Sequence, residues 1–509
     1  MKNNRVVPPH LFVFFTGAAV MATEMSASRF IAPWFGTSMI VWSVLIAVVL
    51  AAMSLGYWLG GRLADRRPSW KILFSIPVAT GVLIALIPHA GNLFFARLTM
   101  GITGTPVNII LLSFVGVIAV FVPPVFLLAM VSPFMIKLLA RADNTGRTAG
   151  SLYAMSTLGS IAGTLGSSLV TIPFLGTRET LFLCSATLIL LGGLGFRGRN
   201  RLVLLLLLLP VSGWLLFGHS IRQGGYIVHE EESVYQYLQV QRRSNGSTVL
   251  IVNEGGGIQS IAREGNTLNP AATYYESYLL LPYMTGETGS MDILVIGAGA
   301  GTIPHWLAFY VRPHMPELST DAVEIDRRVT ELGYEWFGTE RDDARVFTAD
   351  GRIFMDNSDD MYDIIITDTY SNQIYIPFHL TTLEYFSAIR NRLEPGGVVA
   401  MNVNALAEDS PLLQSLGRTA GEVFPFIYVA GVADDRNYML VASDRPLTPP
   451  PPDSILAWNR PLARTAELFA PMFKPFSPTG GMVLTDNRAP VEFMTDVMVA
   501  RQAVSGEGF

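Results

Sequence analysis

Residues 293–301 read Ile-Leu-Val-Ile-Gly-Ala-Gly-Ala-Gly, and a stretch with helical character follows directly. The apolar run predicts a buried strand. A glycine-rich turn between a strand and a helix lets a ligand approach the backbone and meet the helix N-terminus. We therefore expect Gly297, Gly299 and Gly301 to contact a nucleotide-like ligand, although tight turns without a ligand also use glycine.

The next strand supplies an acidic side chain for the same ligand. Residues 322–326 read Ala-Val-Glu-Ile-Asp, and Glu324 lies about 20 residues beyond the glycines, at the tip of this strand. An acidic residue at that place accepts hydrogen bonds from ribose hydroxyls. The two features together favour a nucleotide site over a solvated carboxylate at a strand end.

Two further strands also end in acids. Residues 345–351 read Arg-Val-Phe-Thr-Ala-Asp-Gly, and residues 362–368 read Tyr-Asp-Ile-Ile-Ile-Thr-Asp. Open α/β sheets bind ligands at the carboxyl ends of their strands, so we expect Asp350 and Asp368 to face one nucleotide crevice. A carboxylate there can act as a general base if burial raises its pKa toward neutrality. The repeated strand–helix order predicts one twisted, mainly parallel sheet.

Short alternating runs precede the sheet, and a proline-rich stretch follows it. Residues 226–263 alternate polar and apolar side chains between glycine-containing turns, which predicts a small antiparallel hairpin unit. Residues 446–452 hold four consecutive prolines and are typical of an extended spacer. The residues beyond 453 carry no clear pattern, although Asp486 could return to the site.

The first 221 residues are much more apolar. A bilayer span needs about 20 mainly apolar residues, because water cannot satisfy the backbone there. Seven runs meet this condition: 11–33, 38–61, 72–90, 106–136, 149–173, 179–196 and 202–218. The fourth run contains Pro123-Pro124, so we expect one kinked helix, with two short spans joined by a proline turn as the alternative.

The two halves of the chain carry opposite charge. Residues 1–221 hold 15 Lys and Arg against 4 Asp and Glu, a net of +11, and residues 222–509 hold 20 against 37, a net of −17. With seven spans, the four basic clusters of the first half fall on one face, which the positive-inside rule makes cytoplasmic. The soluble half then lies outside the cytoplasm, whereas an eighth span or re-entrant segment near residues 92–140 would reverse its side.

These patterns predict a multi-span α-helical domain of about seven helices in the cell (inner) membrane, followed by an α/β Rossmann-like domain of methyltransferase type. The expected divisions are a transmembrane domain (1–221), a β-hairpin unit (222–290), a nucleotide-binding transferase domain (291–445) and a proline linker with a C-terminal extension (446–509). The seven His show no metal-ligand spacing, so we expect no metal. We expect no nucleic-acid surface either, because the basic clusters lie in membrane loops.

Residues 228–445 resemble the spermidine synthase (polyamine aminopropyltransferase) family, in the subgroup fused to a membrane domain. The loop at residues 61–66, Gly-Arg-Leu-Ala-Asp-Arg, looks like one in major facilitator transporters. The motifs that carry the family resemblance are Ser233-Val234-Tyr235-Gln236, Tyr274-Tyr275-Glu276, the glycine turn, Glu324-Ile325-Asp326, Asp350-Gly351 and Asp368.

The resemblance implies a role for each matched residue. Gln236, Glu324, Asp350 and Gly351 would hold the adenosine and sulfur part of decarboxylated S-adenosylmethionine. Asp368 would take the proton from the attacking amine. The acceptor amine would lie near Tyr274, Tyr275, Asp326 and Ser371.

Three positions depart from the family pattern. Ala300 stands where the glycine turn usually carries an Asp, Ser371 stands where a second acid is usual, and Tyr275 replaces a His or Gln. Donor and acceptor are both cations, and buried cations need paired acids, so either other acids such as Asp326 or Asp486 substitute or the substrate is not the usual diamine.

The leading interpretation is an aminopropyltransferase that uses decarboxylated S-adenosylmethionine and a small amine, with the lipid bilayer as its surroundings and a homodimer compatible with the sequence. One alternative is a methyltransferase that uses intact S-adenosylmethionine, which the loss of the acid at Ala300 fits. The other alternative is a non-catalytic ligand-binding domain on a transport-like membrane unit.

Overall fold

The computed structural model describes residues 7–35, 39–91, 94–95, 97, 106–141, 143–216, 226–253, 257–269, 271, 273–285, 289–371, 374–431, 437–456 and 459–505. The chain forms two compact units. The first comprises Met1–Gly225 with Glu230–Tyr237, and the second comprises Tyr226–His229 with Leu238–Phe509. The finer divisions expected at residues 222, 291 and 446 stay predictions.

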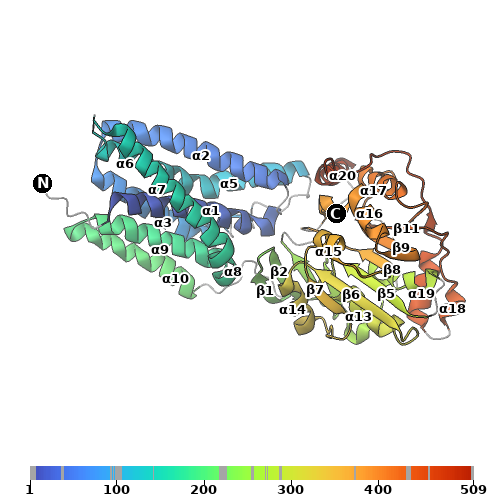
Figure 1. The fold of residues 1–509 in the computed structure, drawn as a ribbon. Coiled ribbons are helices and arrows are strands. Elements are labelled where there is room, and N and C mark those ends of the chain that lie inside the picture. The colour runs from blue at the N-terminus through green and yellow to red at the C-terminus, as the bar shows by residue number, and fades with distance from the viewer. Residues whose placement is uncertain are drawn as a thin grey trace. The chain divides into compact units, whose positions relative to one another are not determined.

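Helices make up most of the first unit. Among its described residues, seven helical segments are long and apolar enough to cross a membrane, which agrees with the number predicted from the sequence. The helices are α1 (Pro9–Phe35), α2 (Met39–Arg66), α3 (Trp70–Leu86), α5 (Pro106–Ala129), α6 (Val131–Leu139), α7 (Thr145–Gly166), α8 (Ile172–Leu175), α9 (Thr177–Gly195) and α10 (Leu208–Leu216), shown in Figure 1. π-helical turns at Ile87–Gly91 and Ser167–Thr171 extend α3 and α7, and a 3-10 segment at Gly198–Leu207 precedes α10.

The fourth predicted span is interrupted on the C-terminal side of its proline pair, where the kink was expected. Pro123 and Pro124 lie inside α5, and the break between α5 and α6 falls at Met130. Pro133 has no N–H, so it cannot form the helical hydrogen bond to the carbonyl of Ala129. The helix is interrupted at this point because that bond is absent. The segment Phe114–Leu139 still counts as one candidate span, as predicted.

Close backbone contact joins α1 to α7. A Cβ atom added at Gly159 would lie 2.0 Å from the carbonyl oxygen of Phe14, and one at Gly163 would lie 2.2 Å from that of Ala18. Small residues that let two helices touch are typical of packing between membrane helices, where water provides no hydrophobic driving force. This contact supports the assignment of the unit as a helical bundle of membrane type.

A small sheet opens the second part of the chain. Its order is β1 (Ile227–Glu232), β2 (Tyr237–Arg242), β3 (Thr248–Val252) and β4 (Ser260–Ala262), and β2–β3 and β3–β4 pair antiparallel. Apolar side chains of β2 and β3 pack against Val329, Leu332 and Phe337 at helix α14 (Arg327–Trp336). The predicted hairpin unit is therefore present, and it is packed against the larger domain.

In the described part of the chain, the main sheet has eight strands in the order β12-β10-β11-β9-β8-β5-β6-β7. The strands are β5 (Met291–Ile296), β6 (Leu318–Glu324), β7 (Arg345–Thr348), β8 (Tyr362–Thr367), β9 (Leu393–Asn404), β10 (Phe426–Gly431), β11 (Asn437–Ser443) and β12 (Phe473–Pro475). Strands β7, β6, β5, β8 and β9 are parallel, whereas β11, β10 and β12 continue the sheet antiparallel. The predicted α/β fold is confirmed, with a larger antiparallel part than the sequence indicated.

Helices cover both faces of this sheet, as Figure 1 shows. Ile293 and Val295 of β5 belong to one buried apolar cluster, and Leu294 and Ile296 belong to another. Alternate residues of a strand point to opposite faces, so a strand buried on both sides is apolar throughout. The remaining helices are α11 (Tyr274–Tyr278), α12 (Leu281–Met284), α13 (Thr302–Trp306), α15 (Gly351–Asn357), α16 (Leu383–Arg390), α17 (Pro411–Gly421), α18 (Pro452–Leu456), α19 (Arg460–Phe469) and α20 (Val491–Ser505).

The C-terminal residues are part of the folded domain. Strand β12 pairs antiparallel with β10, and Leu462 and Phe469 of α19 lie in a buried cluster together with β5. Asp486 returns to the sheet edge, where its carboxylate accepts a hydrogen bond of 2.6 Å from Thr382 and pairs with Arg352 at 3.2 Å. It therefore engages a guanidinium at helix α15.

Candidate active site

The glycine turn after β5 is fixed by close contacts. Gly297, Gly299 and Gly301 have φ angles of +82°, +57° and +86°, a region that other residues rarely adopt. A Cβ atom at Gly297 would lie 2.3 Å from the carbonyl oxygen of Asp368, and one at Gly299 would lie 2.6 Å from the hydroxyl of Ser260. The turn is therefore pressed against the end of β8 on one side and against β4 on another.

Strand β4 of the small sheet holds this turn through hydrogen bonds. The amide of Ala300 donates to the Ser260 hydroxyl at 2.8 Å. The hydroxyl of Thr302, at the start of α13, accepts from the amide of Ile261 at 2.9 Å and donates to its carbonyl at 3.1 Å. The hairpin unit thus positions the backbone that was expected to meet the ligand.

Glu324 lies directly beside the turn. Its carboxylate accepts hydrogen bonds of 2.9 Å from the amides of Gly299 and Asp326, and the residue is 8% exposed. Burial raises the pKa of Glu324 to about 7, although those backbone donors oppose the shift. The structure brings Glu324 and the glycine turn together as the sequence predicted.

Two other predicted residues cap helices. Asp350 accepts hydrogen bonds from the amides of Arg352 at 2.8 Å and Ile353 at 3.1 Å, which caps α15, and its other oxygen lies 3.4 Å from Nε2 of His379. Asp326 accepts from the amide of Arg328 at 3.0 Å and caps α14 in the same way. Both carboxylates satisfy helix N-termini, which is a structural role.

Gly351 allows α15 to approach the sheet. A Cβ atom at this residue would lie 2.5 Å from the Cγ2 atom of Ile296, the last residue of β5. The start of α15 therefore lies against the end of β5, so Asp350 lies at the same edge of the sheet as the glycine turn.

Asp368 follows β8 at the centre of this edge. Its amide donates to the carbonyl of Ile296 at 2.9 Å, and its Oδ1 accepts a hydrogen bond of 3.0 Å from the side-chain amide of Asn402 on β9. Burial raises the pKa of the half-buried Asp368 carboxyl to about 7, and the Asn402 hydrogen bond opposes the shift. A carboxylate with a pKa near neutrality is suited to general-base catalysis.

Four tyrosines lie within electrostatic range of Asp368. Burial is the largest cause that raises the pKa of each of these phenols, and the negative charge of Asp368 raises it further because a second anion is disfavoured nearby. We call this set the tyrosine cluster: Tyr274, Tyr275 and Tyr278 of α11, and Tyr370. The rings of Tyr274 and Tyr275 stack with centroids 4.1 Å apart, and Tyr274 meets Tyr278 edge-on at 6.2 Å.

The rest of the Tyr-Tyr-Glu motif is structural. Glu276 is completely buried, and it accepts hydrogen bonds from Arg263 at 2.7 Å, from the Asn269 amide at 2.8 Å and from the Thr273 amide at 2.9 Å. The Tyr275 hydroxyl donates to the carbonyl of Ile258 at 3.2 Å. Glu276 therefore fixes the start of α11 and orients the tyrosines.

The two remaining predicted residues, Ser371 and Gln236, form hydrogen bonds with residues other than Asp368. Ser371 is exposed, and its hydroxyl donates to the Tyr375 carbonyl at 3.2 Å. Gln236 belongs to the segment Glu230–Tyr237 of the first unit, where its carbonyl accepts from the Ser233 amide at 2.8 Å. Its place at the donor site stays a prediction.

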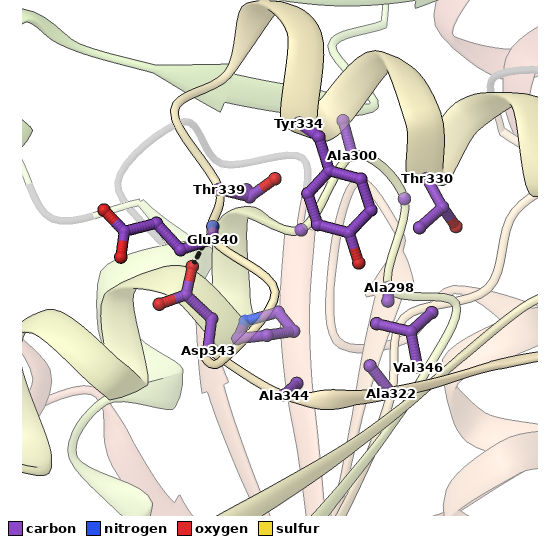
Figure 2. Close-up of a pocket in the computed structure, with 13 residues that line it drawn as sticks. Ala298, Ala300, Ala322, Thr330, Tyr334, Thr339, Glu340, Asp343, Ala344 and Val346 are labelled. Atoms are coloured by element: carbon purple, nitrogen blue, oxygen red, sulfur yellow. Dashed lines mark hydrogen bonds between the residues drawn. The ribbon is translucent and has the colours of Figure 1, made fainter.

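A pocket lies on another side of the glycine turn, and Figure 2 shows Tyr334 of α14 beside Ala300 there. Its lining is mostly apolar and includes residues 298–301, Thr330, Thr339, Glu340 and Val346. Neither Glu324, Asp350 nor Asp368 lines this pocket. Ala300, where an acid was expected, is 1% exposed and packs with Val329, Leu332 and Phe337.

Sequence reasoning missed Asn402 and Tyr278. Asn402 lies in β9, more than 30 residues after Asp368, within an apolar strand where a lone amide is a weak signal. Tyr278 follows the recognised motif by one helical turn, and its position on the face of Tyr274 could have been expected from helical spacing.

Comparison with known proteins identifies relatives of the chain. Residues 273–433 match the family model of the spermine/spermidine synthase domain. A probable polyamine aminopropyl transferase of Bifidobacterium longum is 31% identical over 316 residues, which cover 56% of this chain and 68% of the relative. Polyamine aminopropyltransferase 2 of Ralstonia nicotianae is 24% identical over 426 residues, or 78% of each chain. The crystal structure of a probable spermidine synthase from Corynebacterium glutamicum matches 51% of this chain and 96% of its own, with 19% identity and a TM-score of 0.40.

Proposed function

Because the chain belongs to the polyamine aminopropyltransferase (spermidine synthase) family, we propose that it transfers an aminopropyl group from decarboxylated S-adenosylmethionine to an amine, with Asp368 as general base. One observation carries this proposal. Asp368, whose carboxyl pKa is raised by burial to about 7, lies at the centre of the sheet edge, and its backbone carbonyl lies directly against Gly297 of the glycine turn.

The reaction balances with the residues present. The nitrogen of the neutral acceptor amine attacks the methylene carbon bound to the sulfonium, a C–N bond forms, and the C–S bond breaks. The electron pair of that bond stays on sulfur, so methylthioadenosine leaves as a neutral thioether. The proton that the new ammonium loses goes to the carboxylate of Asp368. Most of the remaining rate enhancement would come from holding donor and acceptor in line.

The donor would occupy the edge formed by β5, β6 and β7. Glu324 would accept hydrogen bonds from the ribose hydroxyls, since it is held beside the turn by the Gly299 amide. Asp350 and Gly351 follow the neighbouring strand β7, where the adenine ring of the donor would be placed.

The experiment uses the full chain in detergent micelles with decarboxylated S-adenosylmethionine and a panel of amines. Release of methylthioadenosine, measured by chromatography, is the expected result. The Asp368→Asn variant should lose at least about 100-fold in kcat, because general-base catalysis contributes about that much or more. The Asp359→Asn variant is the matched control, since the Asp359 side chain is fully exposed and pairs only at the surface with Arg392.

Two other outcomes would replace the proposal. Formation of S-adenosylhomocysteine from intact S-adenosylmethionine, without methylthioadenosine release, would assign a methyltransferase. Binding of neither donor, measured by calorimetry on the full chain, would leave a domain without transferase activity.

We also propose that the seven apolar helices anchor the enzyme in the bilayer as a multi-pass protein. The basic clusters of the first half then face the cytoplasm, which places the second unit on the other side. A Lys474→Cys substitution in a Cys184→Ser background gives one exposed thiol in the second unit. Labelling of intact cells by a membrane-impermeant maleimide is expected, whereas labelling only after lysis would reverse the orientation.

A further inference from the structure

The carboxylate of Asp350 is oriented from two sides. Its Oδ1 atom accepts hydrogen bonds from the amides of Arg352 and Ile353 at 2.8 Å and 3.1 Å. Its Oδ2 atom lies 3.4 Å from Nε2 of His379. The two amides fix the carboxylate to α15, and the imidazole fixes it to the segment that precedes α16. The direction in which this carboxylate points therefore depends on both segments.

Arg352 joins these two segments. Its backbone amide is one of the donors to Asp350, and Nη1 of its guanidinium donates to the carbonyl of His379 at 3.2 Å. The same Nη1 atom donates to the hydroxyl of Thr382 at 3.4 Å. The side chain of Arg352 is 18% exposed, so its guanidinium is largely shielded from water. One residue thus holds both groups that orient the Asp350 carboxylate.

Two carboxylates of different origin hold the guanidinium of Arg352. Asp356 lies one turn later in α15 and accepts from Nε at 3.0 Å and 3.2 Å. Asp486 lies 134 residues further along the chain, and its two oxygens accept from Nη1 at 3.4 Å and from Nη2 at 3.2 Å. A guanidinium is a rigid planar fork, so partners along two of its edges fix its orientation. Asp356 ties Arg352 only to its own helix, whereas Asp486 ties it to a distant part of the fold.

The backbone around Asp486 is anchored independently of its side chain. Leu484 is fully buried, and its amide donates to the hydroxyl of Thr419 at 2.9 Å. The amide of Asp486 donates to the carboxylate of Glu384 at 3.0 Å. The hydroxyl of Thr382 donates to the Asp486 carboxylate at 2.6 Å, which sets the direction of that group. The carboxylate is therefore offered to the guanidinium from a fixed position.

We propose that Asp486 is a positioning residue for the donor: through Arg352 it fixes the direction of the Asp350 carboxylate, which meets the adenine of decarboxylated S-adenosylmethionine. This inference rests on the proposed function, which places the adenine at Asp350. Because Asp486 is 46% exposed, its ion pair with Arg352 contributes little to the stability of the fold. Its effect is on the geometry of one side of the donor site.

The test replaces each carboxylate partner of Arg352 in turn, in the full chain in detergent. The side chains of Asp486 and Asp356 are 46% and 48% exposed, so Asp356→Ala is a matched control that removes one charge from the same guanidinium but no link between segments. Calorimetry should show a Kd for decarboxylated S-adenosylmethionine at least about 5-fold higher in Asp486→Ala, and within about 2-fold of the unsubstituted protein in Asp356→Ala. Equal losses in the two variants would overturn the inference, because they would indicate a general effect of charge.

Kinetics separate positioning from a loss of folded enzyme. In Asp486→Ala the KM for the donor should rise at least about 5-fold, while kcat at saturating donor and the KM for the amine stay within about 2-fold. Asp486→Asn keeps an oxygen acceptor for Thr382 and Arg352, so its donor KM should lie between those of the alanine variant and the unsubstituted protein. A fall in kcat with an unchanged donor KM would indicate fewer folded molecules and would count against the inference.

Amide hydrogen exchange gives a readout that needs no donor. Asp486→Ala should speed exchange in residues 351–357 at least about 3-fold more than Asp356→Ala does, because the start of α15 loses its tie to the C-terminal segment. Equal exchange in both variants would refute the inference whatever the donor does. Donor binding that does not respond to Asp486 overturns the inference alone, whereas an unsubstituted protein that binds no donor overturns the proposed function and the inference together.

Discussion

Replacing Asn402 by leucine tests how the general base is tuned. The Asn402 side chain donates a 3.0 Å hydrogen bond to Oδ1 of Asp368, and this bond lowers the pKa of a carboxyl that burial raises to about 7. Hydrogen bonds to charged groups contribute about 1.5–3 kcal/mol, and one pKa unit corresponds to about 1.4 kcal/mol. The Asn402→Leu variant should therefore raise the pKa of Asp368 by about one to two units.

The assay is the pH dependence of kcat/KM for methylthioadenosine release. The base must be deprotonated to accept a proton, so the acid limb should move to higher pH by the same one to two units. Activity below that limb should fall about 10- to 100-fold, and it should recover as the pH rises above the new pKa. A loss of activity that is equal at every pH would refute the reasoning, because it would indicate damage to the fold or to substrate binding.

A buried amide elsewhere in the same domain serves as the control. Gln414 is 7% exposed and bonds the Glu408 carbonyl at 2.7 Å and the Thr479 amide at 2.8 Å, far along the chain from Asp368. Gln414→Leu should reduce thermal stability without moving the acid limb.

Three further outcomes follow from the same contacts. Asp368→Asn should stabilise the fold at pH 8 by at most about 4 kcal/mol, because the raised pKa makes ionisation costly; thermal melts should show this gain shrinking as the pH falls below about 7 and vanishing only below the unfolded pKa of 3.8, where Asp368 is protonated in both states. Gly299→Ala, at φ +57° and with a hydroxyl oxygen 2.6 Å from the new Cβ, should weaken donor binding in calorimetry and lower the melting temperature, unlike Gly289→Ala, which meets open space. Arg263→Ala should cost about 3–5 kcal/mol in chemical denaturation by leaving Glu276 buried and unpaired, and a loss below about 1 kcal/mol would contradict that role.

Local patterns in the sequence were sufficient for the architecture. The apolar run before Gly297, the acid at Glu324 and the strand before Asp368 each report their own secondary structure, since periodicity and glycine placement act over a few residues. The same holds for the seven apolar segments, whose length and composition alone satisfy the requirement for a bilayer span. The strand–helix order of these segments predicts a parallel sheet. From that topology it follows that Glu324 lies beside the glycine turn and that Asp368 lies at the end of a buried strand.

Tertiary structure decided which side chains surround the reacting group. Asn402 and Tyr278 reach Asp368 from another strand and another helix, and no spacing in the sequence marks either residue, because their meeting depends on the register between β8 and β9 and on where α11 packs. The return of β12 to the sheet likewise arises from contact between distant segments. The sequence by itself determined the two halves of the chain and the strand ends that carry acids. Only the fold determined that the Asp368 carboxylate bonds to the Asn402 amide and lies within electrostatic range of four phenols, because burial and mutual distance exist only once the chain has packed.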